Sequence, residues 1–286
     1  MQPSHQNNQS WDLIIEGKSS LFDLSIKDVW RYRDLLWILV KRDFVSFYKQ
    51  TVLGPLWFFI QPIFTTLVFT FIFGNLAGIS TGKIPQPLFF LAGITAWNYF
   101  ADCLLKTSTV FKDNANIFGK VYFPRIIMPL SIVVSNLVRF GVQFLLLIGV
   151  YVYYLIQGQM LLPGIQILLF PVLVILMAML GLGLGLIITA LTTKYRDLAF
   201  LVQFGVQLLM YATTVAYPLT AAPEKYRSII ELNPMTGIIE FFRFSLLGEG
   251  SVSLNQFLYS SGITAVLLFL GIIIFNRTEK SFVDTI

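Results

Sequence analysis

The stretch VFKDNANIFGKVYFPRIIMP, residues 110–129, sets the fold because it is a short polar island between two long apolar runs. The runs at residues 88–109 and 126–156 are long enough to cross a bilayer, whose hydrocarbon core takes about 20 helical residues. The island therefore predicts a loop at one face of a membrane, between two crossings.

This polar island carries both basic and apolar side chains. Lys106, Lys112, Lys120 and Arg125 place it on the cytoplasmic side, because short cytoplasmic loops are enriched in Lys and Arg. Apolar residues recur in it at roughly helical spacing, with polar neighbours that can cap a helix: Phe111, Asp113, Asn114, Ile117, Phe118, Val121 and Tyr122. The pattern fits either a helix that lies on the membrane surface or a helix that docks onto a cytoplasmic partner.

The composition is that of a polytopic membrane protein. Of the 286 residues, 56% are hydrophobic and 12% are charged, whereas soluble domains are about 25% charged. The net charge of +5 is spread over membrane-flanking loops, so nucleic acid is not an expected partner. A single Cys103 and a single His5 cannot form an intrachain disulfide or a Cys/His cluster for zinc or haem, so no bound metal is expected.

Six apolar segments predict an all-α protein with six transmembrane helices. They lie at residues 52–76, 88–109, 126–156, 164–191, 198–217 and 257–275. In this topology fifteen Lys and Arg residues fall on one side and four on the other, which predicts that both termini are cytoplasmic. Residues 1–51 are then a cytoplasmic tail with an amphipathic helix, 52–275 the transmembrane domain, and 276–286 a second cytoplasmic tail.

Two segments outside the crossings are also expected to be helical. Residues 26–48 mix apolar and basic side chains, which favours an interfacial helix on an anionic leaflet, with packing on a soluble domain as the alternative. Residues 218–255 form the longest polar excursion, in which 224–232 and 236–247 are expected to be short helices that dip back toward the membrane. In the fourth crossing, Gly181, Gly183 and Gly185 predict a face for close helix packing.

Several motifs in this topological order resemble one family, the Wzm-type transmembrane subunit of bacterial ABC exporters that move polysaccharides, whose relatives export capsule and teichoic acid. The matching pieces span nearly the whole chain. They are YRDLLW at 32–37, KRD at 41–43, YKQTVLGPLW at 48–57, QP at 61–62, residues 116–124 with Pro129, KYRDL at 194–198, LNPM at 232–235, EFFR at 240–243 and EKSFVD at 279–284.

The resemblance implies a homodimer in the bacterial inner membrane, paired with two copies of a separate ATPase subunit. The implied substrate is a glycan on an undecaprenyl diphosphate carrier, and ATP and Mg²⁺ would be bound by the partner subunit and no cofactor by this chain. Consistently, the sequence has no nucleotide-binding loop and no nucleophile–base pair, so the chain is not expected to be an enzyme.

The resemblance also implies a role for each segment. Residues 32–49 would be the interface helix, and the first and fifth crossings would border a lateral gate. The coupling helix in the ATPase cleft would use Phe111, Asp113, Asn114, Ile117, Phe118, Lys120 and Tyr122. The outer gate helices at 218–248 would include Asn233, Pro234, Glu240 and Arg243.

A glycan path needs aromatic faces, because pyranose rings stack their C–H patches on them. The aromatic candidates for this lining are Trp57, Phe58, Trp97, Tyr99, Phe204 and Tyr211, with ordinary lipid-facing aromatics as the alternative. The carrier diphosphate needs cations, which suit phosphate oxygens. The candidates for it are Arg31, Arg33, Lys41, Arg42, Lys49 and Arg139.

Two ionisable residues lie inside apolar runs, where such residues usually mark function. Asp102 is one helical turn from Lys106, so a local ion pair explains it as well as a transport role does. Arg139 lies nearer the middle of the third crossing. It either pairs with Asp102 on the neighbouring helix or meets a diphosphate.

Three other classes of function compete with glycan export. A gradient-driven secondary transporter would need membrane-embedded acids or an internal repeat, and the crossings hold only Asp102 and no repeat. A membrane-embedded glycan polymerase would need paired carboxylates beside a crossing, which Asp102, Asp113 and Asp197 do not form. A lipid, drug or haem exporter of the same fold is separable only by its substrate.

Overall fold

The computed structural model describes residues 26–49, 51–118, 123–195 and 197–283, and in these ranges the secondary structure is helical without a strand. The amino-terminal tail, Lys120 and Tyr122 of the expected coupling helix, and Arg196 lie outside the described residues. The helices are α1 Ile26–Arg31, α2 Arg33–Tyr48, α3 Trp57–Phe69, α4 Gln86–Ser108, α5 Val110–Asp113, α6 Ala115–Phe118, α7 Ile127–Ile156, α8 Phe170–Lys194, α9 Leu198–Tyr211, α10 Glu224–Glu231, α11 Pro234–Leu247 and α12 Leu254–Val283.

Three shorter segments extend two of these helices. The 3₁₀ turns η1 Gly54–Leu56 and η3 Ile165–Leu169 lead into α3 and α8, and the π-helical η2 Thr70–Leu76 continues α3. A further 3₁₀ turn, η4 Leu219–Ala221, precedes α10. Proline at the first positions of η1, α4, α8 and α11 fits this pattern, because its fixed φ suits a helix start and its missing N–H has no partner there anyway.

Five described helical segments are long and apolar enough to cross a membrane: Gly54–Leu76, Gln86–Ser108, Ile127–Ile156, Ile165–Lys194 and Leu254–Thr278. The expected fifth crossing, 198–217, contains only the 14-residue helix α9. At about 1.5 Å per residue such a helix spans about 21 Å, less than the ~30 Å hydrocarbon core. The described part of the chain therefore has five candidate spans and one shorter apolar helix, and the expected count of six crossings is not confirmed.

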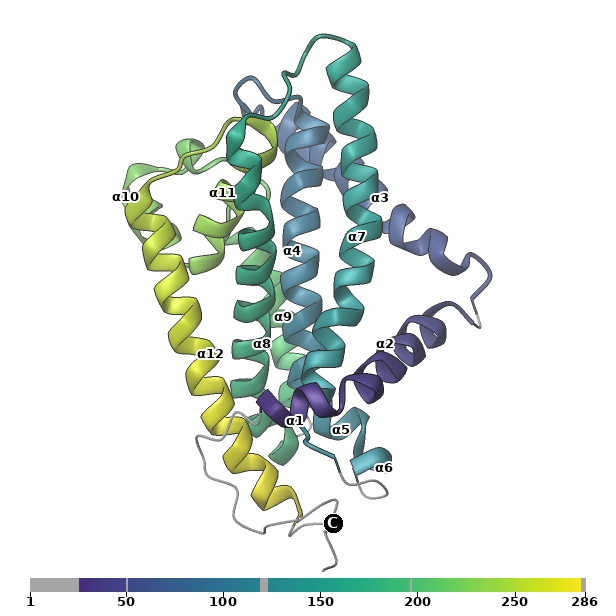
Figure 1. Ribbon diagram of the computed structural model, residues 1–286. Coiled ribbons are helices and arrows are strands. Elements are labelled where there is room, and N and C mark those ends of the chain that lie inside the picture. The colour runs from purple at the N-terminus through teal and green to yellow at the C-terminus, as the bar shows by residue number, and fades with distance from the viewer. Residues whose placement is uncertain (1–25, 50, 119–122, 196, 284–286) are drawn as a thin grey trace, which may run out of the picture.

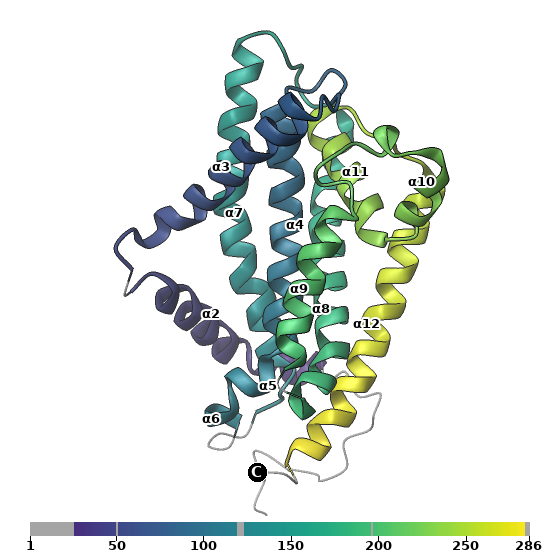
Figure 2. The ribbon, with the colours of Figure 1, turned by 180° about the vertical axis from the view of Figure 1, so that it is seen from behind.

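The helix α4 lies at the centre of the bundle, with α7 on one side and α8 on another, and α12 packs on the outer side of α8 (Figures 1 and 2). Of the most apolar 18-residue stretch in α4, 83% of residues are buried. The sequence agrees with this position, because α4 is the least apolar of the five candidate spans, and at the centre its polar residues Asn98, Asp102 and Lys106 meet protein partners and not lipid.

Close backbone approach fixes α8 between its two neighbours. A Cβ added to Gly181 would lie 2.8 Å from the carbonyl oxygen of Phe100 on α4, and one added to Gly183 would lie 2.8 Å from the Cα of Leu268 on α12. Residues two apart in a helix face nearly opposite ways. The predicted small-residue face is therefore two faces, with Gly181 and Gly185 toward α4 and Gly183 toward α12.

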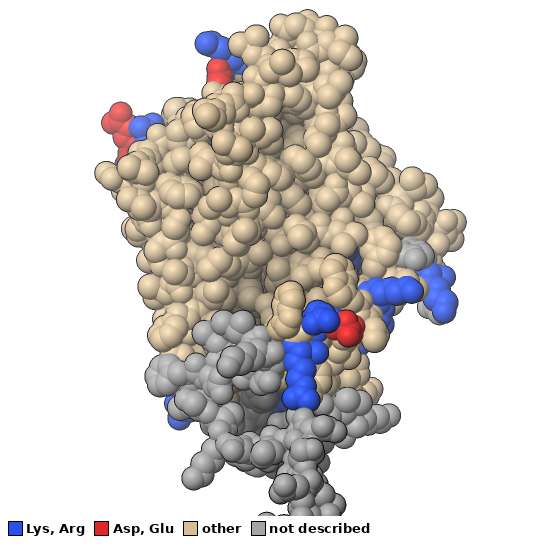
Figure 3. Space-filling model, viewed as in Figure 1, with Lys and Arg blue, Asp and Glu red and all other residues tan. Residues whose placement is uncertain are grey.

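The two ends of the bundle differ in content. We call the end that holds α1, α5, α6 and the last turns of α12 the lower end, and the end that holds α10 the upper end, as drawn in Figure 1. The helix α2 runs obliquely beside the lower half of α7. On the face seen in Figure 3, Lys and Arg atoms gather around the level of α2, whereas most of the surface above them is uncharged.

Candidate functional site

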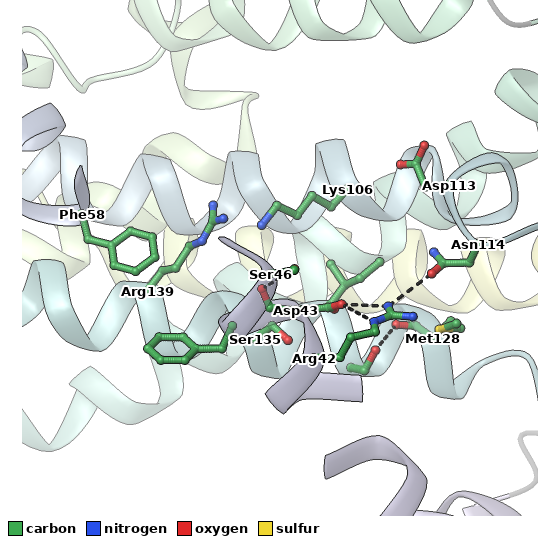
Figure 4. A pocket seen from close by; sticks show the side chains of 13 residues that line it. Arg42, Asp43, Ser46, Phe58, Lys106, Asp113, Asn114, Met128, Ser135 and Arg139 are labelled. Carbon is green, nitrogen blue, oxygen red and sulfur yellow. Dashed lines mark hydrogen bonds and ion pairs between the residues drawn. The ribbon is translucent and has the colours of Figure 1, made fainter. Parts of the chain in front are cut away.

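A polar cavity of about 360 Å³ lies in the lower half of the bundle, between α2, α4, the α5–α6 segment and α7. It is open on one side, and both cations and carboxylates line it. The charged side chains in its wall are Arg42, Asp43, Lys106, Asp113 and Arg139 (Figure 4). Charged side chains are rare within membrane-spanning segments. We call this space the charged cavity.

The first group of contacts ties α2 to the segment after α4. Arg42 Nη2 lies 2.7 Å from Asp43 Oδ1, and the same nitrogen donates to Asn114 Oδ1 at 3.3 Å. Asn114 in turn donates through its side-chain nitrogen to the carbonyl oxygen of Val110 at 3.0 Å. The basic motif KRD on α2 and the polar island are therefore joined through one guanidinium and one amide.

The second group of contacts holds the wall formed by α4 and α7. Arg139 Nη1 lies 3.2 Å from Asp102 Oδ2, and the guanidinium carbon lies 5.2 Å from the ring centroid of Phe58. Lys106 Nζ donates to Asn136 Oδ1 at 2.8 Å. Asp102 thus pairs across helices with Arg139 and not with Lys106. The geometry therefore supports the interpretation in which Arg139 pairs with Asp102 on the neighbouring helix. It does not test the interpretation in which Arg139 meets a diphosphate.

The expected coupling segment folds as two short helices whose aromatic side is inside the protein. Phe111 is fully buried and stacks on Phe275 of α12 with ring centroids 5.0 Å apart, and on its other side it meets Phe118 at 5.5 Å. Phe118 also stacks on Phe123 at 5.8 Å. The outward side chains of this segment are instead Lys112, Asp113 and Asn116. Ile117 is partly buried against the same cluster.

The helical spacing of Phe111 and Phe118 fits a surface for a partner, but in the structure Phe111 stacks on Phe275 and so anchors the segment to α12, with Phe118 packed against Phe111. Sequence periodicity alone cannot distinguish an apolar face turned inward from one turned outward. Asp113 stays exposed and accepts a hydrogen bond from Thr109 Oγ1 at 2.6 Å.

The aromatic residues expected to line a glycan path divide into two groups. Phe58, Trp97 and Tyr99 are buried within the chain, at 5%, 3% and 3% exposure. Trp57, Phe204 and Tyr211 are 45%, 58% and 46% exposed and lie on α3 and α9. In this conformation only the second group faces outward from the chain.

A buried ion pair lies between α11, α4 and the end of α9. Arg243 and Glu240 are each 1% exposed, and Arg243 Nη1 lies 3.4 Å from Glu240 Oε1. The Arg243 guanidinium donates to the carbonyl oxygens of Thr214 at 2.6 Å and Val215 at 2.9 Å, and lies 3.7 Å above the ring of Phe89.

The same buried pair also shapes the chain around it. The carbonyl oxygens of Thr214 and Val215 that Arg243 binds lie just beyond Tyr211, the last residue of α9, so the guanidinium satisfies backbone of the segment that follows the helix. Gly93 on α4 gives the guanidinium room, since a Cβ there would collide with Arg243 Nη2. Glu240 Oε2 accepts a hydrogen bond from the backbone N–H of Ser251 at 3.1 Å.

The remaining expected gate residues form a helix cap. Asn233 Oδ1 accepts the backbone N–H of Met235 at 3.0 Å, and Asn233 Nδ2 donates to Thr213 Oγ1 at 2.8 Å. Pro234 follows at the first position of α11. The LNPM motif therefore starts α11 and ties it to the chain just beyond α9.

The cations expected to meet a diphosphate are not all in one place. Arg42 and Arg139 line the charged cavity, whereas Arg31, Arg33, Lys41 and Lys49 are exposed residues outside its wall. Sequence reasoning did not include Lys106 and Ser135 among the candidates, although both line the cavity. Lys106 could have been found from the sequence, because it follows Asp102 by one turn of α4 and so lies on the same side of the helix.

The fold, the spans and the buried charges define a multi-pass membrane protein, and comparison with known families agrees. Residues 34–247 match the ABC-2 type transporter family, and the chain belongs to this family. Members similar to it are membrane permeases and not enzymes, and the expected relationship to polysaccharide-exporter permeases is confirmed.

Similar proteins cover nearly the whole chain. An O-antigen export system permease protein RfbA from Myxococcus xanthus is 29% identical over 264 residues, which is 91% of this chain and 98% of that protein. A protein of the same name from Klebsiella pneumoniae is 30% identical over 257 residues, 88% of this chain and 94% of that protein. The polysialic acid transport protein KpsM of Escherichia coli is 24% identical over 250 residues, 85% of this chain and 93% of that protein.

Proposed function

We propose that this chain is the transmembrane subunit of an ABC transporter that exports an undecaprenyl-diphosphate-linked, O-antigen-like polysaccharide across the bacterial inner membrane. The observation that carries the proposal is the match to O-antigen export permeases over 88–91% of this chain. The charged cavity supports it, because a lipid diphosphate needs cations close to apolar helices.

The proposal includes six crossings with both termini in the cytoplasm. The helix α9 would be the fifth crossing, and α10 and α11 would be re-entrant gate helices beside it. The buried segment at residues 213–216, just after α9, and the largely buried α11 support this topology, because irregular backbone is tolerated at membrane depth only where protein surrounds it. Lys and Arg near α2 support a cytoplasmic lower end. The division into residues 1–51, 52–275 and 276–286 belongs to the same proposal.

The proposal assigns ATP hydrolysis to a separate subunit, present in two copies, that binds ATP and Mg²⁺. Its docking site would be the outward side of α5 and α6, with Lys112, Asp113 and Asn116, while Phe111 anchors that segment to α12. Charge reversal in the variant Lys112→Glu should weaken co-purification of the ATPase subunit. The control is Lys83→Glu, an exposed lysine at the upper end, which should leave co-purification unchanged.

The proposal also includes a homodimer that encloses the glycan path. The exposed aromatic residues Trp57, Phe204 and Tyr211 support this, because α3 and α9 carry few buried residues and their exposed apolar faces would meet a second copy. A capsule polysaccharide is the second candidate substrate, favoured by the similarity to KpsM.

The decisive experiment purifies the chain in mild detergent together with the ATPase subunit and measures ATP hydrolysis with undecaprenyl-linked glycans. We expect stimulation by O-antigen-type glycans carried on undecaprenyl diphosphate. Stimulation by capsule-type glycan alone would favour the second candidate. A partner without stimulation by either glycan would contradict glycan export, and absence of any ATPase partner would favour a gradient-driven transporter.

A further inference from the structure

A second cavity lies above the charged cavity, between α3 and α7. It has a volume of about 530 Å³, and its wall is formed by Phe59 of α3 and by apolar and tyrosine side chains of α7. Those of α7 include Leu146, Gly149, Val150 and Tyr153. No charged residue is among its lining residues in the part of the chain that the structure describes. We call it the apolar groove.

The two cavities lie on the same face of α7. In the charged cavity α7 contributes Ile132, Ser135 and Arg139, and in the apolar groove it contributes Leu146 and Tyr153. These positions are three, four or seven residues apart, which is the spacing of one helix face. From Arg139 to Leu146 the rise along α7 is about 10 Å. On α3, the adjacent residues Phe58 and Phe59 line one cavity each.

The charged cavity offers hydrogen-bond donors that the protein itself does not use up. The Ser135 side chain is 8% exposed, and its hydroxyl has no hydrogen-bond partner among the described residues. The Lys106 ammonium has three N–H donors and one hydrogen bond, to Asn136. Figure 4 shows Ser135, Lys106 and Arg139 around the same space.

The carboxylates near this cavity explain how its cations are tolerated when it is empty. Arg42 is paired with Asp43, and Arg139 with Asp102, so neither guanidinium is left as an uncompensated charge. A ligand with several anionic oxygens would add bonds to the same cations. Arg and Lys both bind phosphate oxygens, Arg as a planar fork and Lys as a point charge.

We propose that the two cavities together bind one polyprenyl diphosphate lipid along α7, with the diphosphate in the charged cavity and the isoprenoid chain in the apolar groove. The inference rests on the proposed function and adds a place for the carrier to it. A soluble anion would need only the lower cavity, whereas an amphiphile with an anionic head and a long apolar chain matches both. A diphosphate matches cations contributed by three helices, α2, α4 and α7.

The test measures binding of undecaprenyl diphosphate to the purified complex of this chain with its ATPase subunit, by native mass spectrometry. Lys106→Met should weaken binding about tenfold or more, because a charge-assisted hydrogen bond to phosphate is lost. Lys106→Arg should restore most of it. The control Lys83→Met removes an exposed lysine at the upper end and should not change binding.

A matched pair of glycines tests the apolar groove. Gly149 and Gly141 are both on α7, and a Cβ added to either meets no atom within 4 Å, but only Gly149 lines the groove. Gly149→Leu places a larger side chain in the groove, with open space for its Cβ, and should weaken binding of undecaprenyl diphosphate several-fold, while binding of inorganic pyrophosphate stays unchanged. Gly141→Leu should change neither.

Equal binding by Lys106→Met, Gly149→Leu and the wild type would overturn the proposal. Displacement of undecaprenyl diphosphate by an equimolar amount of phosphatidylglycerol would also overturn it, because the occupant would then be a bilayer phospholipid. Glycan-stimulated ATP hydrolysis distinguishes failure of the proposed carrier site from failure of the proposed function. Stimulation that is normal in both variants refutes the carrier site and keeps the proposed function, whereas a wild-type complex without stimulation refutes the proposed function.

Discussion

The block formed by α4, α8 and α12 differs sharply from the two flanking helices α3 and α9. In the most apolar stretch of α4, 83% of residues are buried, against 22% in Gly54–Leu76, and in α9 only Val206 is buried. Burial alone does not separate the block from α3, because only 17% of the most apolar stretch of α12 is buried. The difference lies in the contacts: the block is held by close backbone approach at Gly181, Gly183 and Gly185, whereas α3 meets α4 through side chains such as Phe69, which packs on Phe90.

The close backbone approaches indicate which helices we expect to move together. Because little space separates α8 from α4 and α12 at its glycine positions, we expect these three helices to move as one, and we call them the stiff unit. Through the stacking of Phe111 on Phe275, the α5–α6 segment belongs to that unit. The exposed apolar faces of α3 and α9, including Phe64 and Phe204, require lipid or a second copy to cover them.

The largest loss of stability is expected when Arg243 is removed, because this side chain of α11 binds the segment that follows α9. Arg243→Met should destabilise the protein by about 3–5 kcal/mol, because Glu240 is left as a buried charge without its partner. The measurement is the thermal unfolding midpoint in detergent. The double variant Glu240→Gln with Arg243→Met should recover part of the loss, and a midpoint unchanged by Arg243→Met would contradict a buried pair.

The next largest effect concerns the anchor of the α5–α6 segment. Phe111→Ala should lower the free energy of unfolding by up to about 5 kcal/mol, because a buried ring is removed beside Phe275. The matched control is Phe64→Ala on α3, which is 63% exposed and should change stability by less than about 0.5 kcal/mol. Equal midpoints for the two variants would show that the segment is not part of the stiff unit.

A smaller effect tests the backbone contact between α8 and α12. Gly183→Ala places a Cβ 2.8 Å from the Cα of Leu268, and the resulting overpacking should cost about 1–3 kcal/mol. Wild-type stability in this variant, measured as resistance to heat-induced aggregation in detergent, would mean that α8 and α12 can separate without cost.

The smallest effect is expected for the same substitution on a flanking helix. Gly205 on α9 has no atom within 4 Å of an added Cβ. Gly205→Ala should therefore stabilise the chain by about 0.5–1 kcal/mol, since Ala is the better helix former. A loss of stability in the isolated chain would place α9 in a tighter environment than its exposure indicates.

Sequence patterns predicted most of the fold, because long apolar runs and helix-starting prolines are local signals. The expected segments 88–109 and 126–156 correspond to α4 Gln86–Ser108 and α7 Ile127–Ile156. The short length of α9 was not predictable, since residues 198–217 are mostly apolar, and Arg243, which binds the backbone just beyond the helix, lies far along the chain.

The candidate site was predictable only in part. Arg139 and Asp102 stand out because charges are rare inside apolar runs, and their pairing across helices is seen in the structure. Ser135 gave no signal, because a serine in a transmembrane helix usually bonds to its own backbone. The inward direction of Phe111 depends on Phe275, which no local pattern connects to it.

The space that Gly93 leaves for Arg243 has a consequence for sequence variation in the family. In a relative that keeps arginine at position 243, a side chain at position 93 would force the guanidinium to move away from its present place, because a Cβ there would collide with Nη2. We therefore expect a relative with a larger residue at position 93 to have a shorter or neutral residue at 243, and a changed residue at 240 because the buried carboxylate would lose its partner. The three positions should therefore be inherited as one set, and replacing them singly should be the rarest path between related permeases.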